Sequence, residues 1–264
     1  MIIDAQSDKL LAKKGLSFEK FYALCQEPPQ LCLELLQLQG LELDFIEGKY
    51  FYRTKFTAIK DSTFCIVDIE TNGSDPKKHQ IIEIGAIKIQ NNKIVDTFES
   101  LVQCETISKH ITALTGIDVK QTLNAPPLKS VMQKFHQFLG SSVFLAHDVK
   151  FDYFYISAMF EQVGLPKLLN RKMCTIALAE RSFSSYKYGL SYLNESLKLY
   201  NEATHHRALS DAKTTKRLFI YSLKHLPKKI QYTEELIQFS QEASRLKRPK
   251  FDPFIVEKKK EEKD

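Results

Sequence analysis

The stretch Phe64-Cys-Ile-Val-Asp-Ile-Glu-Thr-Asn-Gly73 decides the fold class of this chain of 264 residues. Its first four residues form a continuous apolar run, which is typical of a central strand buried on both faces. Because side chains alternate along a strand, Asp68 and Glu70 point to the same side. Two carboxylates in one place repel each other, and burying either one unpaired is costly. The pair therefore predicts a shared cation, Mg²⁺ or Mn²⁺ by its oxygen ligands, or else a solvated strand end capped by polar residues.

The residues around this stretch predict an α/β domain over 62–226. Apolar runs and alternation predict strands, and apolar residues at helical spacing predict helices. Asn91-Asn92 suits a tight hairpin turn between two of the strands. We expect strands at 64–67, 81–90, 94–102 and 143–146, and helices at 128–139, 151–163, 174–181, 190–199 and 208–224.

Two further acids and a histidine follow in the same domain. Asp152 ends the segment Ala146-His-Asp-Val-Lys-Phe-Asp152, where the chain passes from a strand into a helix. It can reach the crevice beside a neighbouring strand, or it is a first-turn acid favoured by the helix dipole. Asp211 lies early in the 208–224 helix and is open to the same two interpretations. His206 precedes it by five residues, and an imidazole can accept a proton near neutral pH, although a lone histidine is more often structural.

These residues form three motifs, Asp-Ile-Glu-Thr, Ala-His-Asp-x-x-Phe-Asp and His-Arg-Ala-x-x-Asp-Ala. In this order and spacing they resemble the exonuclease motifs of the DEDDh 3′→5′ exonucleases, over about residues 62–226. Within that superfamily the chain resembles the proofreading (epsilon) subunit of bacterial DNA polymerase III. The resemblance implies a ribonuclease-H-like fold, a mixed five-stranded sheet flanked by helices.

The resemblance also implies a role for each matched residue. His206 would be the general base, and its distance from Asp211 fits the histidine subclass. Asp148 stands where the family usually has Asn, so a further carboxylate is available to join the metal shell. His147 and His205 remain open between structural and functional roles. Two divalent cations, Mg²⁺ or Mn²⁺, would be held by Asp68, Glu70, Asp152 and Asp211, and substrate would be bound by Thr71, Asp148 and Thr115.

The implied reaction is hydrolysis of the terminal phosphodiester at a DNA 3′ end, which releases a nucleoside 5′-monophosphate. The implied role is proofreading in replication beside a polymerase catalytic subunit. A stand-alone DNA-repair or RNA-trimming exonuclease is the alternative. A non-catalytic nucleic-acid-binding protein is less favoured, because all four acids and the histidine are present.

The flanking regions predict two appendages. Residues 1–60 contain apolar helical spacing at 18–25 and 31–38, then alternation at 41–45 and 50–56, which indicates a small winged-helix-like unit or a packing appendage. Residues 227–264 contain an amphipathic stretch, 233–246, and the apolar island Pro249-Lys-Phe-Asp-Pro-Phe-Ile-Val256 in a charged setting. That island is either a flexible peptide that docks on a polymerase or a plug on the chain's own domain.

Charge and cysteine content narrow the class of protein. The chain has 38 Lys and Arg residues and 32 Asp and Glu residues, which gives a net charge of +6. The whole excess lies in residues 205–264, where there are 15 Lys and Arg and 9 Asp and Glu. This excess permits a nucleic-acid partner. Apolar stretches are too short for a membrane span. The five scattered cysteines predict buried free thiols in a reducing, cytoplasmic setting.

Overall fold

A five-stranded mixed sheet forms the core of the computed structural model, which describes residues 3–201 and 206–254. The strands lie in the order β6-β5-β4-β7-β8, with β4 antiparallel to β5 and parallel to β7. The predicted fold class is confirmed. The three-residue strand β8 was not among the expected strands, because so short a run carries no readable alternation. The bounds are β4 (Phe64–Thr71), β5 (Ile81–Gln90), β6 (Lys93–Leu101), β7 (Val143–Ala146) and β8 (Lys172–Cys174).

Strand β4 continues past the apolar run that predicted it. It stays paired with β5 as far as Thr71, which lies opposite Ile81. The expected end at Val67 is therefore wrong, and Asp68 and Glu70 lie within the strand rather than after it. Hydrogen bonds of the sheet consequently fix the backbone at both acids.

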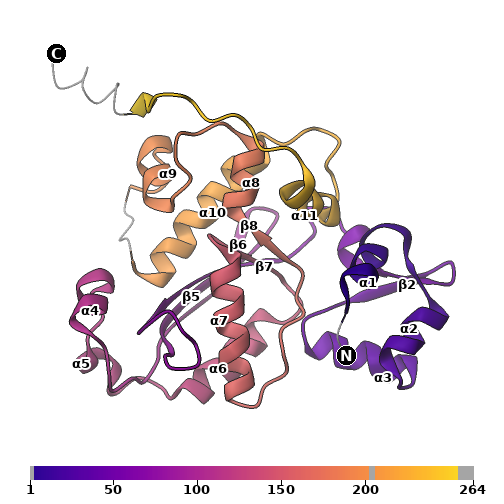
Figure 1. Ribbon diagram of the computed structural model, residues 1–264, viewed down its shortest axis with the longest axis horizontal. Coiled ribbons are helices and arrows are strands. Elements are labelled where there is room, and N and C mark those ends of the chain that lie inside the picture. The colour runs from indigo at the N-terminus through magenta and orange to yellow at the C-terminus, as the bar shows by residue number, and fades with distance from the viewer. Residues whose placement is uncertain (1–2, 202–205, 255–264) are drawn as a thin grey trace.

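Helices cover both faces of the sheet (Figure 1). On one face, α6 (Leu128–Leu139) and α7 (Val149–Gln162) pack over alternate residues of β4 such as Val67. On the other face, α8 (Thr175–Ser182), α10 (Ala208–Lys224) and α11 (Thr233–Glu242) pack over residues such as Ile66. The shorter helices α4 (Lys109–Thr115), α5 (Val119–Thr122) and α9 (Leu190–Leu197) complete this part of the chain.

The first 55 residues contain a separate small sheet and its own core, seen as the indigo lobe in Figure 1. Its strand order is β1-β3-β2, with Phe21, Leu36 and Tyr50 in the core. The predicted hairpin is present, but its second strand ends at Tyr52 instead of continuing to Phe56. The winged-helix interpretation stays a prediction. The elements are α1 (Ala5–Lys9), a π-helical turn (Leu10–Lys14), β1 (Leu16–Ser17), α2 (Phe18–Cys25), α3 (Pro29–Leu38), β2 (Leu43–Ile46), β3 (Lys49–Tyr52) and a 3₁₀ turn (Arg53–Lys55).

The cysteines are not all free thiols. Cys25 and Cys32 form a disulfide that links the end of α2 to α3, so the prediction is wrong for these two. They are seven residues apart, and the turn at Pro28 brings their helices together. Cys65 and Cys104 are buried free thiols as expected, and Cys174 is free and partly buried.

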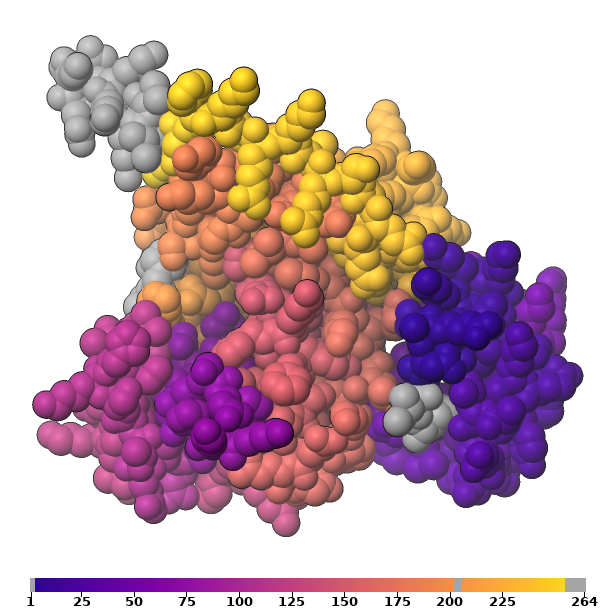
Figure 2. All heavy atoms as spheres, viewed as in Figure 1, coloured from indigo at the N-terminus to yellow at the C-terminus, as the bar shows by residue number. Residues whose placement is uncertain are grey.

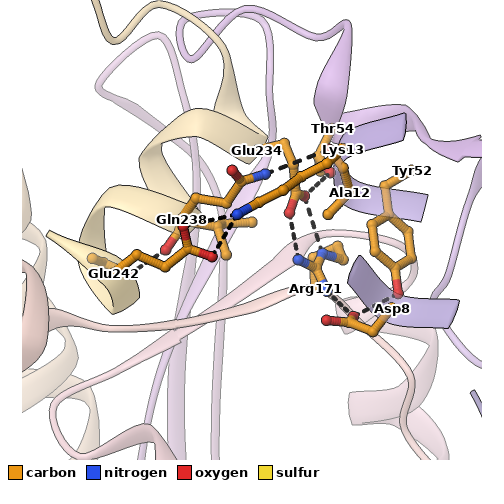
Figure 3. A network of polar contacts seen from close by, with 11 residues as sticks. Asp8, Ala12, Lys13, Tyr52, Thr54, Arg171, Glu234, Gln238 and Glu242 are labelled. Carbon is orange, nitrogen blue, oxygen red and sulfur yellow. Dashed lines mark hydrogen bonds and ion pairs between the residues drawn. The ribbon is translucent and has the colours of Figure 1, made fainter. Parts of the chain in front are cut away.

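A polar network joins the N-terminal unit to β8 and α11 (Figure 3). Arg171 lies at its centre and pairs with Glu234 of α11 at 2.5 Å and with Asp8 of α1 at 2.9 Å. The Tyr52 hydroxyl donates to Asp8, and the Thr54 hydroxyl donates to Glu234, both at 2.7 Å. Each buried or half-buried carboxylate in this interface therefore has a cation and a hydroxyl donor.

Residues 233–254 pack on the five-stranded sheet and its helices rather than standing apart. Leu236 and Ile237 of α11 belong to the same core as Ile66. The segment 243–254, here called the strap, then crosses α8 and α9, where Figure 2 shows it in yellow over the orange helices. Arg245 and Arg248 of the strap pair with the buried Glu180 at 3.1 and 2.8 Å.

The contacts of residues 252 and 254 bear on the two interpretations of the apolar island 249–256. The Tyr192 hydroxyl donates to Asp252 at 2.6 Å, and the Tyr192 and Phe254 rings are in contact. Asp252 and Phe254 therefore pack on the chain's own domain, as the plug interpretation expects, whereas Lys250, Phe251 and Pro253 are exposed, with Phe251 79% exposed. Ile255, Val256 and the charged run after them lie outside the described residues. Among the residues that are described, no helix is long and apolar enough to cross a membrane.

Candidate active site

The central strand β4 presents two acids on the face that α10 covers. Asp68 and Glu70 lie on the same face of the strand as Phe64 and Ile66, which belong to the core under α10. In the pairing with β5, Asp68 lies opposite Gly85 and Glu70 lies opposite Glu83. Both acids are partly buried.

Gly85 allows α10 to start directly above Asp68. A Cβ atom at position 85 would lie 2.1 Å from the Leu209 nitrogen, so only glycine fits beneath the first turn of the helix. This close approach brings Asp211, which is buried, over the same part of the sheet. Asp211 therefore faces the sheet and lies on the same side of it as Asp68 and Glu70.

His206 lies in the turn that leads into α10. Its backbone has a φ of 60°, in the left-handed region, and its N–H donates to Asp211 Oδ2 at 2.9 Å. One ligand atom from each of Glu70, His206 and Asp211 lies within 4.8 Å of the others. The His206 side chain is exposed, so water can reach it. His205, whose role the sequence does not decide, falls outside the described residues.

Asp152 comes from the opposite layer of the fold. It lies in the first turn of α7, is 5% exposed, and interacts with the charges of Asp148 and Glu70 and with the backbone of Ile69. The helix begins after Asp148, whose φ of 82° is a conformation that Asp and Asn tolerate better than most residues. Asp148 itself is exposed. The structure thus brings Asp152, rather than Asp148, into the buried group of acids.

The acids raise one another's pKa. Burial raises the pKa of Asp68 well above its usual range, and the charges of Asp152, Asp211, Glu70 and Glu83 raise it further. Burial, followed by the charges of Asp211 and Glu83, raises the pKa of Glu70 to about 7, while Arg207 acts in the opposite direction. Burial also raises the pKa of Asp152 well above its usual range, against the stabilising effect of backbone N–H groups.

This excess of negative charge fits a divalent cation. Carboxylate oxygens are the ligands that Mg²⁺ and Mn²⁺ prefer, and a cation among them removes their mutual repulsion. A histidine nitrogen within reach of Glu70 and Asp211 adds a group that can ligate or accept a proton. The residues present therefore suit hard divalent ions at the end of β4.

The predicted substrate-binding residues are placed differently from one another. Thr71 is the last residue of β4, next to Glu70, and is partly buried. Asp148 is exposed at the start of α7. Thr115 is buried, and its hydroxyl donates to the Ile111 carbonyl at 3.0 Å and accepts from the Ile117 N–H at 3.1 Å. The Thr115 side chain therefore stabilises the end of α4, and a role for it in substrate binding stays a prediction.

Three residues near the site were not assigned from the sequence. His147 Nε2 donates to the Tyr188 carbonyl at 2.9 Å, and burial lowers the pKa of His147 to about 4, so it is a neutral structural histidine. Glu83, 1% exposed, pairs with Arg207 at 2.7 Å. A signal for Glu83 was present, because it is an acid within the apolar run Ile82-Glu83-Ile84 of a buried strand.

Comparison with known proteins agrees with this geometry. The model of the RNase_T family, described as Exonuclease, matches residues 65–219. The chain belongs to this family, within the DEDDh 3′→5′ exonuclease superfamily. The match covers the whole sheet apart from the first residue of β4, together with α4 to α9 and the first part of α10.

The chain is also similar in sequence to DNA polymerases III of the PolC type and in structure to two exonucleases. The DNA polymerase III PolC-type of Caldanaerobacter subterraneus subsp. tengcongensis is 40% identical over 170 residues, which are 63% of this chain and 12% of that protein. The PolC-type enzyme of Staphylococcus aureus is 32% identical over 172 residues, again 12% of its length. Exonuclease X in complex with 5′ overhanging duplex DNA is 26% identical, with a TM-score of 0.53 over 67% of this chain and 99% of that chain. E. coli Exonuclease I, 16% identical with a TM-score of 0.52 over 62% of this chain and 44% of that chain, shares the fold.

Proposed function

We propose that this protein is a metal-dependent exonuclease that removes nucleotides from the 3′ end of DNA and releases nucleoside 5′-monophosphates. The observation that carries the proposal is the convergence of Asp68, Glu70, Asp152 and Asp211 beside His206. Together these acids hold more negative charge than the neighbouring Arg207 can balance. Membership of the exonuclease family supports the same activity.

The four carboxylates would hold two divalent cations, Mg²⁺ or Mn²⁺. When bound, such ions lower the pKa of an attacking water and stabilise the charge on the leaving 3′ oxygen. The chain's contribution is a fixed set of oxygens. Asp68 and Glu70 are held by the sheet, and Asp152 and Asp211 are held by the first turns of two helices.

His206 would accept the proton of the attacking water. It is exposed, while its backbone is held by Asp211, so the ring stands at the solvent side of the acids. General-base assistance of this kind is typically worth about 10²–10⁴-fold in rate. Thr71, which follows Glu70 on β4, would lie beside the terminal nucleotide.

DNA is the substrate that the relatives favour. The PolC-type relatives are DNA polymerases by name, and the Exonuclease X structure contains DNA. The chain spans 12% of the length of the PolC-type relatives, so their polymerase activity is not carried over. Proofreading as an epsilon-like subunit remains the proposed cellular role, with the cytoplasm as the proposed location.

The decisive experiment uses a 5′-labelled single-stranded DNA with Mg²⁺ or Mn²⁺. We expect products that shorten stepwise from the 3′ end, a rate about 10²–10⁴-fold lower for His206→Ala, and no cleavage in EDTA. Glu234→Gln, remote from the acids, is the matched control and should keep its rate per folded molecule. Full activity of Asp68→Asn or cleavage unaffected by EDTA would overturn the proposal.

The class of substrate and the polymerase partner are tested in two separate experiments. Equal-length RNA and a primer with a mismatched 3′ end distinguish RNA trimming from proofreading, which predicts faster removal of the mismatched end than of a paired one. For the partner, we propose that the polymerase catalytic subunit binds the exposed Phe251 side chain, because Asp252 and Phe254 beside it contact Tyr192 on the chain's own domain. Phe251→Glu should weaken co-elution with that subunit and spare nuclease activity, whereas unchanged co-elution contradicts this docking site.

A further inference from the structure

The start of α10 is anchored on one side by a buried carboxylate that the proposed chemistry does not use. Glu83 of β5 accepts hydrogen bonds from Arg207 Nη2 at 2.7 Å and Nε at 3.1 Å, and from the backbone N–H of Ala208 at 2.9 Å. Glu83 is 1% exposed, whereas 42% of the Arg207 side chain is exposed. A buried carboxylate with three donors holds its partners in a defined geometry.

The turn is anchored on its other side by Asp211. The N–H of His206 donates to Asp211 Oδ2, and His206 adopts a left-handed φ of 60°. Such a backbone conformation is unfavourable for most residues and persists only where the surroundings hold it. Two residues that follow it in the chain hold it, Arg207 through its ion pair with Glu83 and Asp211 through its carboxylate.

The position of Glu83 would be unfavourable without Arg207. Glu83 lies directly opposite Glu70 across the β4–β5 pair, and like charges in that arrangement destabilise a sheet. The Arg207 guanidinium offsets this repulsion and at the same time ties the turn to the sheet. The ion pair between Glu83 and Arg207 thus offsets the repulsion between Glu83 and Glu70, and it holds Arg207, the residue next to His206, against the sheet.

We infer that Glu83 and Arg207 are positioning residues that act through His206, by fixing the turn that carries its imidazole against the acids. This inference rests on the proposed exonuclease function. It assigns a function to a carboxylate and a guanidinium that are neither among the four proposed metal-binding acids nor the proposed general base.

The expected effect is on turnover and not on substrate affinity. Arg207→Gln should lower kcat about 10- to 100-fold with little change in KM, because a catalytic group displaced by about 1 Å loses rate of this order. Glu83→Gln should lower kcat by a smaller factor, since the amide oxygen can still accept one hydrogen bond. Arg207→Lys should recover little of the kcat lost in Arg207→Gln, because an ammonium group lacks the bidentate donor geometry of a guanidinium.

A double-mutant cycle separates positioning from general structural damage. If Arg207 acts through His206, Arg207→Gln lowers kcat in the wild-type background but adds no loss in His206→Ala. The same factor in both backgrounds would overturn the inference. Glu234→Gln, which breaks a comparable buried pair with Arg171, is the control for destabilisation. Loss of wild-type activity altogether, or full activity of His206→Ala, would instead count against the proposed function.

Hydrogen exchange gives a readout that does not need activity. The amides of His206 and Ala208 are bonded to Asp211 and Glu83, and both should exchange faster in Arg207→Gln than in the wild type. Glu234→Gln should leave these amides unchanged. Equal exchange in the wild type and Arg207→Gln would overturn the inference even if the protein proved to have no nuclease activity.

Discussion

Two clusters of buried acids in this protein differ in how their negative charge is balanced. The acids of one cluster pair with a guanidinium, whereas most of the acids of the other lie next to further acids. At the interface of Figure 3, Glu234 and Asp8 face the Arg171 guanidinium and hydroxyl donors from Tyr52 and Thr54. At the end of β4, Asp68, Glu70, Asp152 and Asp211 gather with Arg207 as their neighbouring guanidinium, and Arg207 is already bound to Glu83.

The difference separates a structural cluster from a functional one. Breaking a buried ion pair destabilises a fold because it leaves a charge without its partner. Removing one of several mutually repelling acids relieves repulsion instead, so the fold gains stability while any bound cation loses a ligand. The two clusters should therefore respond to the same kind of substitution with opposite signs.

The largest expected effect is on activity at the end of β4. Asp68→Asn should lower the exonuclease rate by about 10³-fold or more, because charge stabilisation by a bound cation is worth several kcal/mol and each 1.4 kcal/mol is about tenfold. The same variant, measured without metal at pH 8, should unfold at a higher denaturant concentration than the wild type. A metal-free Asp68→Asn that is less stable than the wild type would show that repulsion among the acids does not govern the stability of this region.

The interface cluster should show the reverse. Glu234→Gln should lower the free energy of unfolding by about 3 kcal/mol, because Arg171 loses its closest charged partner in a buried place. Its exonuclease rate per folded molecule should equal that of the wild type. Urea unfolding together with an activity assay checks both statements, and a selective loss of rate without a loss of stability would contradict them.

The pH dependence of stability follows from the raised pKa of Glu70. Because this pKa rises from 4.5 to about 7 in the folded protein, the protonated form stabilises the fold below pH 4.5, and this contribution is lost as the pH rises through 7. The lowered pKa of His147 acts oppositely between about pH 4 and 6.5, so the comparison must be with Glu70→Gln. We expect the free energy of unfolding of the metal-free wild type to fall relative to that of Glu70→Gln as the pH rises from 4.5 to about 7.

Metal should reverse this loss. Mg²⁺ at about 100 times its dissociation constant should add about 2.7 kcal/mol per bound ion at pH 8 and much less at pH 5, where protons compete for the same oxygens. Thermal unfolding with and without Mg²⁺ measures both values. An equal gain at both pH values would contradict binding to these acids.

The smallest effect is expected at Asp148. The residue is exposed, and Asn tolerates the same left-handed backbone, so Asp148→Asn should change the free energy of unfolding by less than about 0.5 kcal/mol. The exonuclease rate should fall far less than in Asp68→Asn, because Asp148 is exposed and lies outside the buried group of acids. A loss comparable to that of Asp68→Asn would place Asp148 in the metal shell after all.

The sequence predicted the fold, and it drew attention to four acids that lie close together in the structure, for a physical reason. Apolar periodicity and charged residues inside apolar segments are local signals, and Asp68, Glu70 and Asp211 each carry one. The ends of elements were less predictable, because pairing with β5 extended β4 past Val67. The length of β8 and the Cys25–Cys32 bond depend on contacts between segments that no local pattern encodes.

The anchors of the site were the part that sequence reasoning missed. Glu83 and His206 are more than a hundred residues apart, and their link through Arg207 depends on the approach of α10 to Gly85. The apolar island 249–256 was predicted as either a docking peptide or a plug. The contact of Arg248 with Glu180, which favours the plug, is again a long-range pairing.

The most direct test of the account is the binding of Mn²⁺ at pH 8, followed by the electron paramagnetic resonance signal of the free ion. The wild type and Glu234→Gln should each bind two Mn²⁺ per chain, and Asp68→Asn should bind fewer or bind much more weakly. If the wild type binds none, or if Asp68→Asn binds as tightly as Glu234→Gln, the acids at the end of β4 are not a metal site and the central claim is wrong.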